Sequence, residues 1–158
     1  MKRFLLSFVV FAALAAGPLM AQTNPFVGTW KLNVAKSKYE PGPAPQSGTR
    51  TIVADGDGAK YSFEIVRADG TANSYSYTVK YDGKDYPITG SGAPGGADSI
   101  AVKRVGTSKA EATLKKAGKE VAKSWVEVSK DGTLTTVKVK GKTPDGKDFN
   151  SEAVYDKQ

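Results

Sequence analysis

Tyrosine and arginine are the side chains in this sequence best able to hold a ligand, because two more reactive types are missing. The 158-residue chain contains neither cysteine nor histidine. Their absence removes Cys- and His-based nucleophiles and the usual ligands of transition metals. Hydroxyl donors, cations and aromatic faces remain, and these bind molecules rather than transform them. The predicted ligand-binding set is Tyr61, Phe63, Tyr75, Tyr77, Tyr81, Arg104 and Tyr155.

The spacing of these aromatic residues indicates that they share one face of a sheet. Tyr61 and Phe63 alternate with polar residues, as do Tyr75 and Tyr77. Successive residues of a strand point to opposite faces, so each alternating set points one way. In a filled interior these rings form a core, and in a hollow barrel they line a cavity. Both readings stay open, although each buried phenol needs a hydrogen-bond partner, which favours a polar interior.

Arg104 is a cation that this pattern could turn inward, because Ile100 and Val102 share its parity. If Arg104 stays outside, the predicted set contains hydroxyls but no cation. A buried anion without a partner is energetically costly. The sequence then predicts a preference for neutral ligands over fatty acids.

No enzyme is predicted, and no catalytic residue, metal site or cofactor. The carboxylates of Asp82 and Asp85 lie in turn sequences, where such groups serve the backbone. Residues 55–58 (DGDG) resemble the start of a calcium loop but lack its remaining spaced ligands. We interpret them as a turn.

Repeated Asp-Gly pairs predict hairpins, and the segments between them alternate in polarity. We expect an all-β fold, an antiparallel meander of eight to ten strands that closes into a small β-barrel. The predicted strands are 27–33, 48–55, 59–67, 72–81, 97–105, 109–116, 120–129, 133–141 and 147–156. Two segments depart from this rhythm: proline-rich 35–47, expected to be an extended loop, and glycine-rich 90–96, expected to be flexible. Either could border a binding mouth or serve only as a connection.

The N-terminus predicts export. Residues 1–3 are positively charged, 4–16 are almost wholly apolar, and small Ala21 precedes the expected cleavage site. We therefore expect a signal peptide over 1–21, one domain over 22–158, and a periplasmic or secreted protein.

The basic charge is concentrated in residues 103–147, which carry twelve basic and five acidic side chains. Nearly all of the basic ones are lysines, whereas nucleic-acid readers favour arginine forks and interleaved aromatics. We predict no nucleic-acid partner, at most weak contact of this stretch with an anionic envelope surface, and a monomer. The expected outward position of Trp125 beside Lys123 would contribute to such contact.

Residues 24–32 (NPFVGTWKL) resemble the first strand of the lipocalin and fatty-acid-binding-protein superfamily, the calycins. The stretches GTWKLN, YDGKDYP and the terminal AVYDKQ are closer to bacterial exported proteins with a lipocalin-like domain. The resemblance implies a lipocalin-like barrel with Trp30 as a plug at its closed end. It also implies a small amphipathic or hydrophobic ligand. Ala153 departs from the pattern, because fatty-acid-binding proteins have there an arginine that holds the ligand carboxylate.

Two functions follow as hypotheses. The first is an exported lipocalin-like binding protein for a small amphipathic or hydrophobic molecule. The alternative is an envelope-associated structural or interaction domain with a filled interior and a basic outer face. A cavity on the order of a few hundred Å³ lined by these tyrosines would favour the first, and a packed interior would favour the second.

Overall fold

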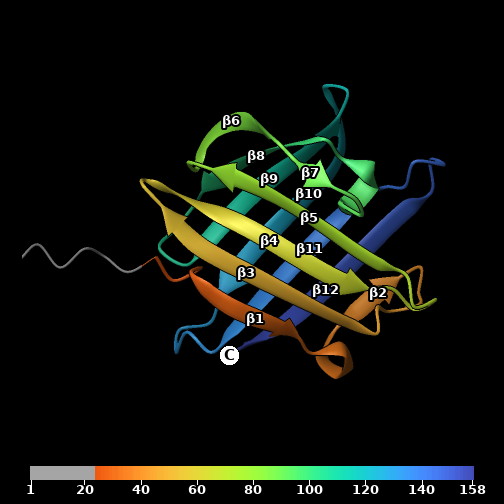
Figure 1. The fold of residues 1–158 in the computed structure, drawn as a ribbon, viewed down its shortest axis with the longest axis horizontal. Helices are drawn as coiled ribbons and strands as arrows, with labels where there is room; N and C mark the ends of the chain where they lie inside the picture. The colour runs from red at the N-terminus through yellow and green to blue at the C-terminus, as the bar shows by residue number, and fades with distance from the viewer. Residues whose placement is uncertain (1–23) are drawn as a thin grey trace, which may run out of the picture.

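The computed structural model describes residues 24–158, which form one curved antiparallel sheet (Figure 1). The predicted signal peptide lies outside these residues. The strands are β1 (Gly28–Leu32), β2 (Lys38–Glu40), β3 (Ser47–Asp55), β4 (Gly58–Val66), β5 (Ala72–Val79), β6 (Asp82–Pro87), β7 (Thr89–Gly90), β8 (Ser99–Arg104), β9 (Lys109–Lys116), β10 (Lys119–Val128), β11 (Leu134–Lys142) and β12 (Asp148–Lys157). Two short 3₁₀ helices, η1 (Val34–Lys36) and η2 (Pro94–Gly96), complete the described elements.

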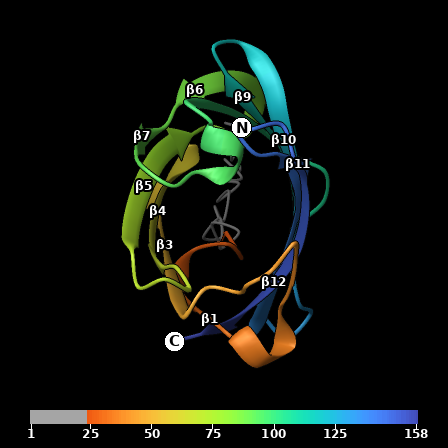
Figure 2. The ribbon, with the colours of Figure 1, turned by 90° about the vertical axis from the view of Figure 1, so that its right-hand side faces the viewer.

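The sheet curls into a nearly closed barrel through two connections between distant parts of the chain. First, β1 pairs with both β12 and β3, which joins the two ends of the chain. Second, β6 pairs with β8 whereas β7 pairs with β5, and only Ile88 separates β6 from β7. The chain thus passes from one edge of the sheet to the other at this bend. The view along the interior shows the strands arranged as a surrounding wall (Figure 2). The predicted all-β antiparallel barrel is confirmed.

The strand count exceeds the prediction of eight to ten, because the sheet contains twelve strands. The nine predicted strands all form, and β2, β6 and β7 are additional. β2 and β7 are only three and two residues long, and β6 contains a glycine with a positive φ of 76°. None of the three has an alternating pattern of useful length. Their pairing with strands distant in sequence holds them in the sheet.

The two segments expected to be irregular are partly ordered. Proline-rich 35–47 contains the end of η1 and all of β2, which pairs with β12. Glycine-rich 90–96 contains η2, and Ala93 beside it is buried. Backbone pairing in the first case and apolar burial in the second stabilise conformations that their composition does not encode.

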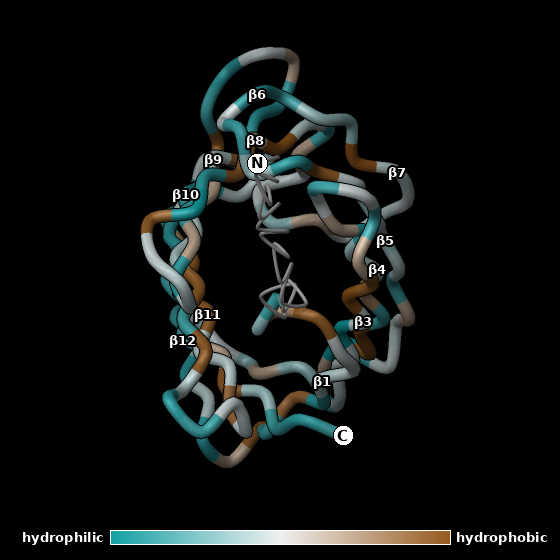
Figure 3. The backbone as a smooth tube through the Cα atoms, turned by 90° about the vertical axis from the view of Figure 1, so that its left-hand side faces the viewer, coloured by the Kyte–Doolittle hydropathy of each residue, from teal (hydrophilic) through white to brown (hydrophobic). Residues whose placement is uncertain are grey.

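Alternation along the strands proceeds as the sequence predicts. On β9, Ala110 and Leu114 are buried while Glu111 between them is exposed. Figure 3 shows hydrophilic and hydrophobic stretches interleaved along the walls. The β9–β10 hairpin turns at Ala117 and Gly118, whose φ values are 48° and 77°. Two successive positive φ angles match the right-handed twist of the paired strands.

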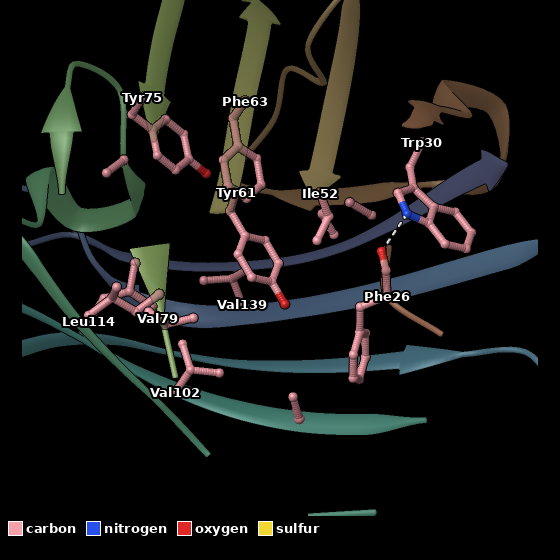
Figure 4. Close-up of a cluster of buried hydrophobic side chains, with 14 of the residues drawn as sticks. Phe26, Trp30, Ile52, Tyr61, Phe63, Tyr75, Val79, Val102, Leu114 and Val139 are labelled. Carbon is pink, nitrogen blue, oxygen red and sulfur yellow. Dashed lines mark hydrogen bonds between the residues drawn. The ribbon is translucent and has the colours of Figure 1, made fainter. Parts of the chain in front are cut away.

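Trp30 is completely buried, as the predicted plug requires. Its indole Nε1 donates to the carbonyl oxygen of Phe26 at 2.9 Å, and Phe26 is itself buried (Figure 4). The polar atom of a large ring is therefore satisfied inside an apolar environment, which such burial needs. Trp30 belongs to the structural core of this end of the barrel.

Candidate ligand-binding site

The barrel surrounds a cavity of about 160 Å³. Apolar side chains such as Leu32 and Leu114 supply much of its lining, and aromatic rings project into it from β4 and β5. Figure 4 shows Tyr61 pointing toward Val139 and Tyr75 lying beside Phe63. The interior of the barrel is thus hollow. The cavity volume is smaller than the several hundred Å³ typical of ligand pockets.

Two cross-strand ring pairs form the aromatic wall of the cavity. Phe63 faces Tyr75 in the β4–β5 register, with ring centroids 4.4 Å apart and planes 9° from parallel. Tyr61 faces Tyr77 in the same register at 4.9 Å. Such neighbours on one face of an antiparallel pair interact directly. The alternation in the sequence correctly brought these four residues together.

Arg50 on β3 is the cation of this cavity, and it is not among the residues predicted to bind a ligand. Its side chain lines the cavity and only 2% of the residue is exposed. The guanidinium lies over the rings of Phe63 and Tyr155, at 5.5 and 5.3 Å from their centroids. Two of its nitrogens, Nε and Nη1, have no hydrogen-bond partner among residues 24–158. The expectation of an inward set without a cation is therefore wrong.

The signal for Arg50 was present in the sequence. Arg50 alternates with Gly48 and Ile52, and all three are buried. Parity alone therefore predicts an inward arginine. It was overlooked because arginine is among the residues least often buried.

Arg104 does not enter the cavity. It is the last residue of β8 and is exposed at the barrel end, where its Nη2 donates to Oδ1 of Asn24 at 2.9 Å. Its guanidinium lies over the rings of Tyr81 and Phe26, at 4.7 and 5.3 Å. Parity with Val102 gives Arg104 the inward face, but the strand ends there, and the side chain extends over the rim.

Tyr81 also lies outside the cavity lining, in a separate surface depression that includes Arg104. Its hydroxyl is 2.7 Å from that of Tyr61, which joins this depression to the cavity wall. The remaining predicted residues, Tyr61, Phe63, Tyr75, Tyr77 and Tyr155, all line the cavity. The two irregular segments reach it as well, through Tyr39 and Pro45 from the first and Pro94 from the second.

The cavity tyrosines remain protonated at neutral pH. Burial raises the pKa of Tyr61, Tyr75 and Tyr155 above its ordinary value, and the positive charge of Arg50 opposes that shift in each. Burial raises the pKa of Tyr77 in the same way. A neutral phenol can donate as well as accept a hydrogen bond. The cavity thus combines one cation with several hydroxyl donors.

Within residues 24–158, no helix has the length and apolar character needed to span a membrane. The same part of the chain contains no group of three or more carboxylates that could hold a metal ion.

The fold and the cavity define the class: an antiparallel β-barrel around a mainly apolar cavity that is lined in part by the buried side chain of Arg50. The sequence matches no protein-family model, and no curated protein matches it in sequence. Among solved structures, the chain is similar to zebrafish ileal bile-acid-binding protein complexed with cholic acid. The two are 13% identical, with a TM-score of 0.47 over 85% of this chain and 99% of that one.

Proposed function

We propose that this protein binds a small amphipathic or hydrophobic molecule inside its barrel. The observation that carries the proposal is the cavity inside the barrel, about 160 Å³ in volume, with stacked rings on one wall and aliphatic side chains on another. Ligand pockets of proteins combine such apolar walls with a few placed polar groups. Nothing in this arrangement requires bond-making chemistry, so the proposed activity is binding rather than catalysis.

A cavity-filling variant tests the proposal. Ala153 is buried on β12 and lines the cavity, so Ala153→Leu adds bulk at a site where a ligand would lie. Ala101→Leu is the matched control, because Ala101 alternates with buried Ile100 and Val102 and is not part of the cavity lining.

Native mass spectrometry of protein purified from an exporting host should show a small molecule on the wild type and the control. The molecule should be lost from Ala153→Leu. Equal retention by both variants would place the ligand elsewhere.

The proposal includes export to the periplasm or the outside of the cell, and a monomeric state. Export is supported by the charged start, the short apolar run and Ala21. Intact mass should show exported protein beginning at or near Gln22. Retention of Met1 in that fraction would contradict export.

A second candidate function uses the outer face of the barrel, and the position of Trp125 favours it. Trp125 is 38% exposed and faces Lys138 in the β10–β11 register, next to the Lys123–Lys140 pair. Lys138 is paired with Glu152 at 3.3 Å, which reduces the local positive charge. We therefore propose only weak adhesion to anionic surfaces.

Cosedimentation with vesicles containing anionic lipid tests the second candidate. Binding should disappear at moderate salt, because exposed charges are screened beyond about 8–10 Å. At low salt, Trp125→Ala should weaken binding to the vesicles, without affecting retention of the molecule inside the barrel.

A further inference from the structure

Arg50 is a buried charged group whose surroundings leave some of its hydrogen-bond donors without acceptors. An arginine keeps its charge at any pH a protein meets. Burying a cation in a medium of low dielectric is costly unless a counter-charge or hydrogen bonds compensate. The two rings over which Arg50 lies compensate part of this cost through cation–π attraction. Nε and Nη1 are left without acceptors among the described residues.

No protein carboxylate fills this role within residues 24–158. Arg50 forms no ion pair there, and Glu111 is the one acidic residue that borders the cavity. Glu111 is exposed on β9, where it faces Lys103 and Trp125 across the sheet. Its side chain therefore belongs to the outer face, and the charge of Arg50 is unopposed from within the barrel.

The volume of the cavity limits the size of a ligand that could neutralise the charge of Arg50. An engineered cavity of roughly 150 Å³ holds one benzene molecule, and the cavity here is about 160 Å³. A long acyl chain needs considerably more space. A single ring or a short branched chain, with one polar group, matches the available space.

We propose that the cavity binds a compact organic anion, a small aromatic or aliphatic carboxylate, whose charged group pairs with Arg50. This inference rests on the proposed binding function and names the ligand class for it. The flat guanidinium offers parallel donors to the two carboxylate oxygens. The protonated phenols around it donate further hydrogen bonds, and the apolar wall contacts the ring or chain.

Matched acids and amides test the inference directly. Benzoate against benzamide, and hexanoate against hexanamide, keep the size and shape of the ligand and change its charge. Isothermal titration with the purified protein should show the acids binding roughly ten- to a hundredfold more tightly, the usual effect of a hydrogen bond to a charged group. Oleate should bind more weakly than hexanoate, because its chain exceeds the cavity.

Variants of the two arginines assign the preference. Arg50→Met keeps a long apolar side chain and removes the charge, so it should abolish the preference for the acid while amide binding persists. Arg50→Lys should retain part of the preference. Arg104→Met is the matched control, because it removes an arginine that also stacks on aromatic rings but lies outside the cavity. It should leave the preference unchanged.

The outcomes separate this inference from the proposed function. Equal or tighter binding of the amides by the wild type would overturn the anion assignment and leave the binding function intact. A preference for the acid that moves with Arg104 instead of Arg50 would overturn the assignment to the cavity. Failure of every acid and amide to bind, together with no co-purified molecule, would reject the proposed function and the inference with it.

Discussion

Arg50 and Arg104 have similar aromatic surroundings but differ in their hydrogen-bond partners. Both lie over two aromatic rings at similar distances. Arg104, at the rim, is exposed to solvent and donates to Asn24. Arg50, in the cavity, is almost fully buried and has two nitrogens without partners. Arg104 thus has a hydrogen-bond partner within the protein, whereas two donors of Arg50 have none among residues 24–158. A buried charged group without partners is more typical of a binding site than of a structural core.

The same contrast extends to the residues around each arginine. At the barrel end that holds Trp30 and Arg104, the Trp30 indole donates to Phe26, and Asn24 donates to the Tyr81 hydroxyl at 3.3 Å. Both regions are aromatic, but Arg50 in the cavity has two buried nitrogens without partners among residues 24–158, whereas these side chains at the barrel end are hydrogen-bonded. We therefore expect substitutions at the barrel end that holds Trp30 to lower the free energy of unfolding, and substitutions at Arg50 to alter ligand binding more than stability.

Alkaline pH should produce the largest effect, and it acts on the cavity. Burial raises the pKa of Tyr61, Tyr75, Tyr77 and Tyr155, so in the folded state they keep their protons above pH 10, where unfolded tyrosines lose them. Their contribution to stability is complete below pH 10 and is lost as the pH rises above it. The loss is on the order of 1 kcal/mol for each tyrosine one pH unit above 10.

Tyrosinate absorbance followed alongside circular dichroism checks this. Most of the seven tyrosines should ionise only as the barrel unfolds. Smooth titration near pH 10 with the far-ultraviolet spectrum intact would show that the cavity is open to water.

Trp30→Ala should give the next largest effect on stability, and it acts on the barrel end that holds Trp30. It removes a fully buried ring and the hydrogen bond to Phe26, and substitutions of this kind lower the free energy of unfolding by about 3–5 kcal/mol. Urea denaturation measures the change. Because Trp30 is not part of the cavity lining, ligand affinity measured well below the midpoint should be preserved. An unchanged midpoint would contradict the role of Trp30 as a plug.

Arg50→Met should have a smaller effect on stability, in the opposite direction. Removing a buried donor set without partners relieves about 1–3 kcal/mol, and losing the cation–π contacts offsets part of this. The free energy of unfolding without ligand should stay equal or rise by up to about 2 kcal/mol. A marked fall in the urea midpoint would mean that Arg50 braces the fold and would weaken the contrast between the two regions.

Arg104→Met should have the smallest effect. The group is exposed, and its hydrogen bond to Asn24 and its ring contacts together are worth at most about 1 kcal/mol. We expect a slight decrease in the urea midpoint that becomes smaller still at high salt. A loss as large as that of Trp30→Ala would show that Arg104 contributes as much as Trp30 to the stability of this barrel end.

Local pattern in the sequence was sufficient to predict much of this protein. Alternation placed Tyr61, Phe63, Tyr75 and Tyr77 on one inward face, because a strand exposes successive residues to opposite sides. Asp-Gly pairs marked the hairpin turns near residues 55–58, 69–70, 131–132 and 145–146, since tight turns need residues that accept positive φ. The pair at 82–83 marked no hairpin, because it lies inside β6, which pairs with β8 and not with β5. The all-β barrel follows from the same local rules. The burial of Trp30 was implied only by the family resemblance of residues 24–32.

The tertiary structure decided what depends on residues far apart in the chain. β7 joins the sheet because β5 accepts it, and β2 because β12 does. Alternation along β3 is sufficient to predict that Arg50 points inward. Whether it meets a carboxylate there depends on side chains from β4, β9 and β12. The volume of the cavity likewise depends on how the two edges of the sheet close. A strand determines which way its side chains point, whereas only the closed barrel determines what they meet.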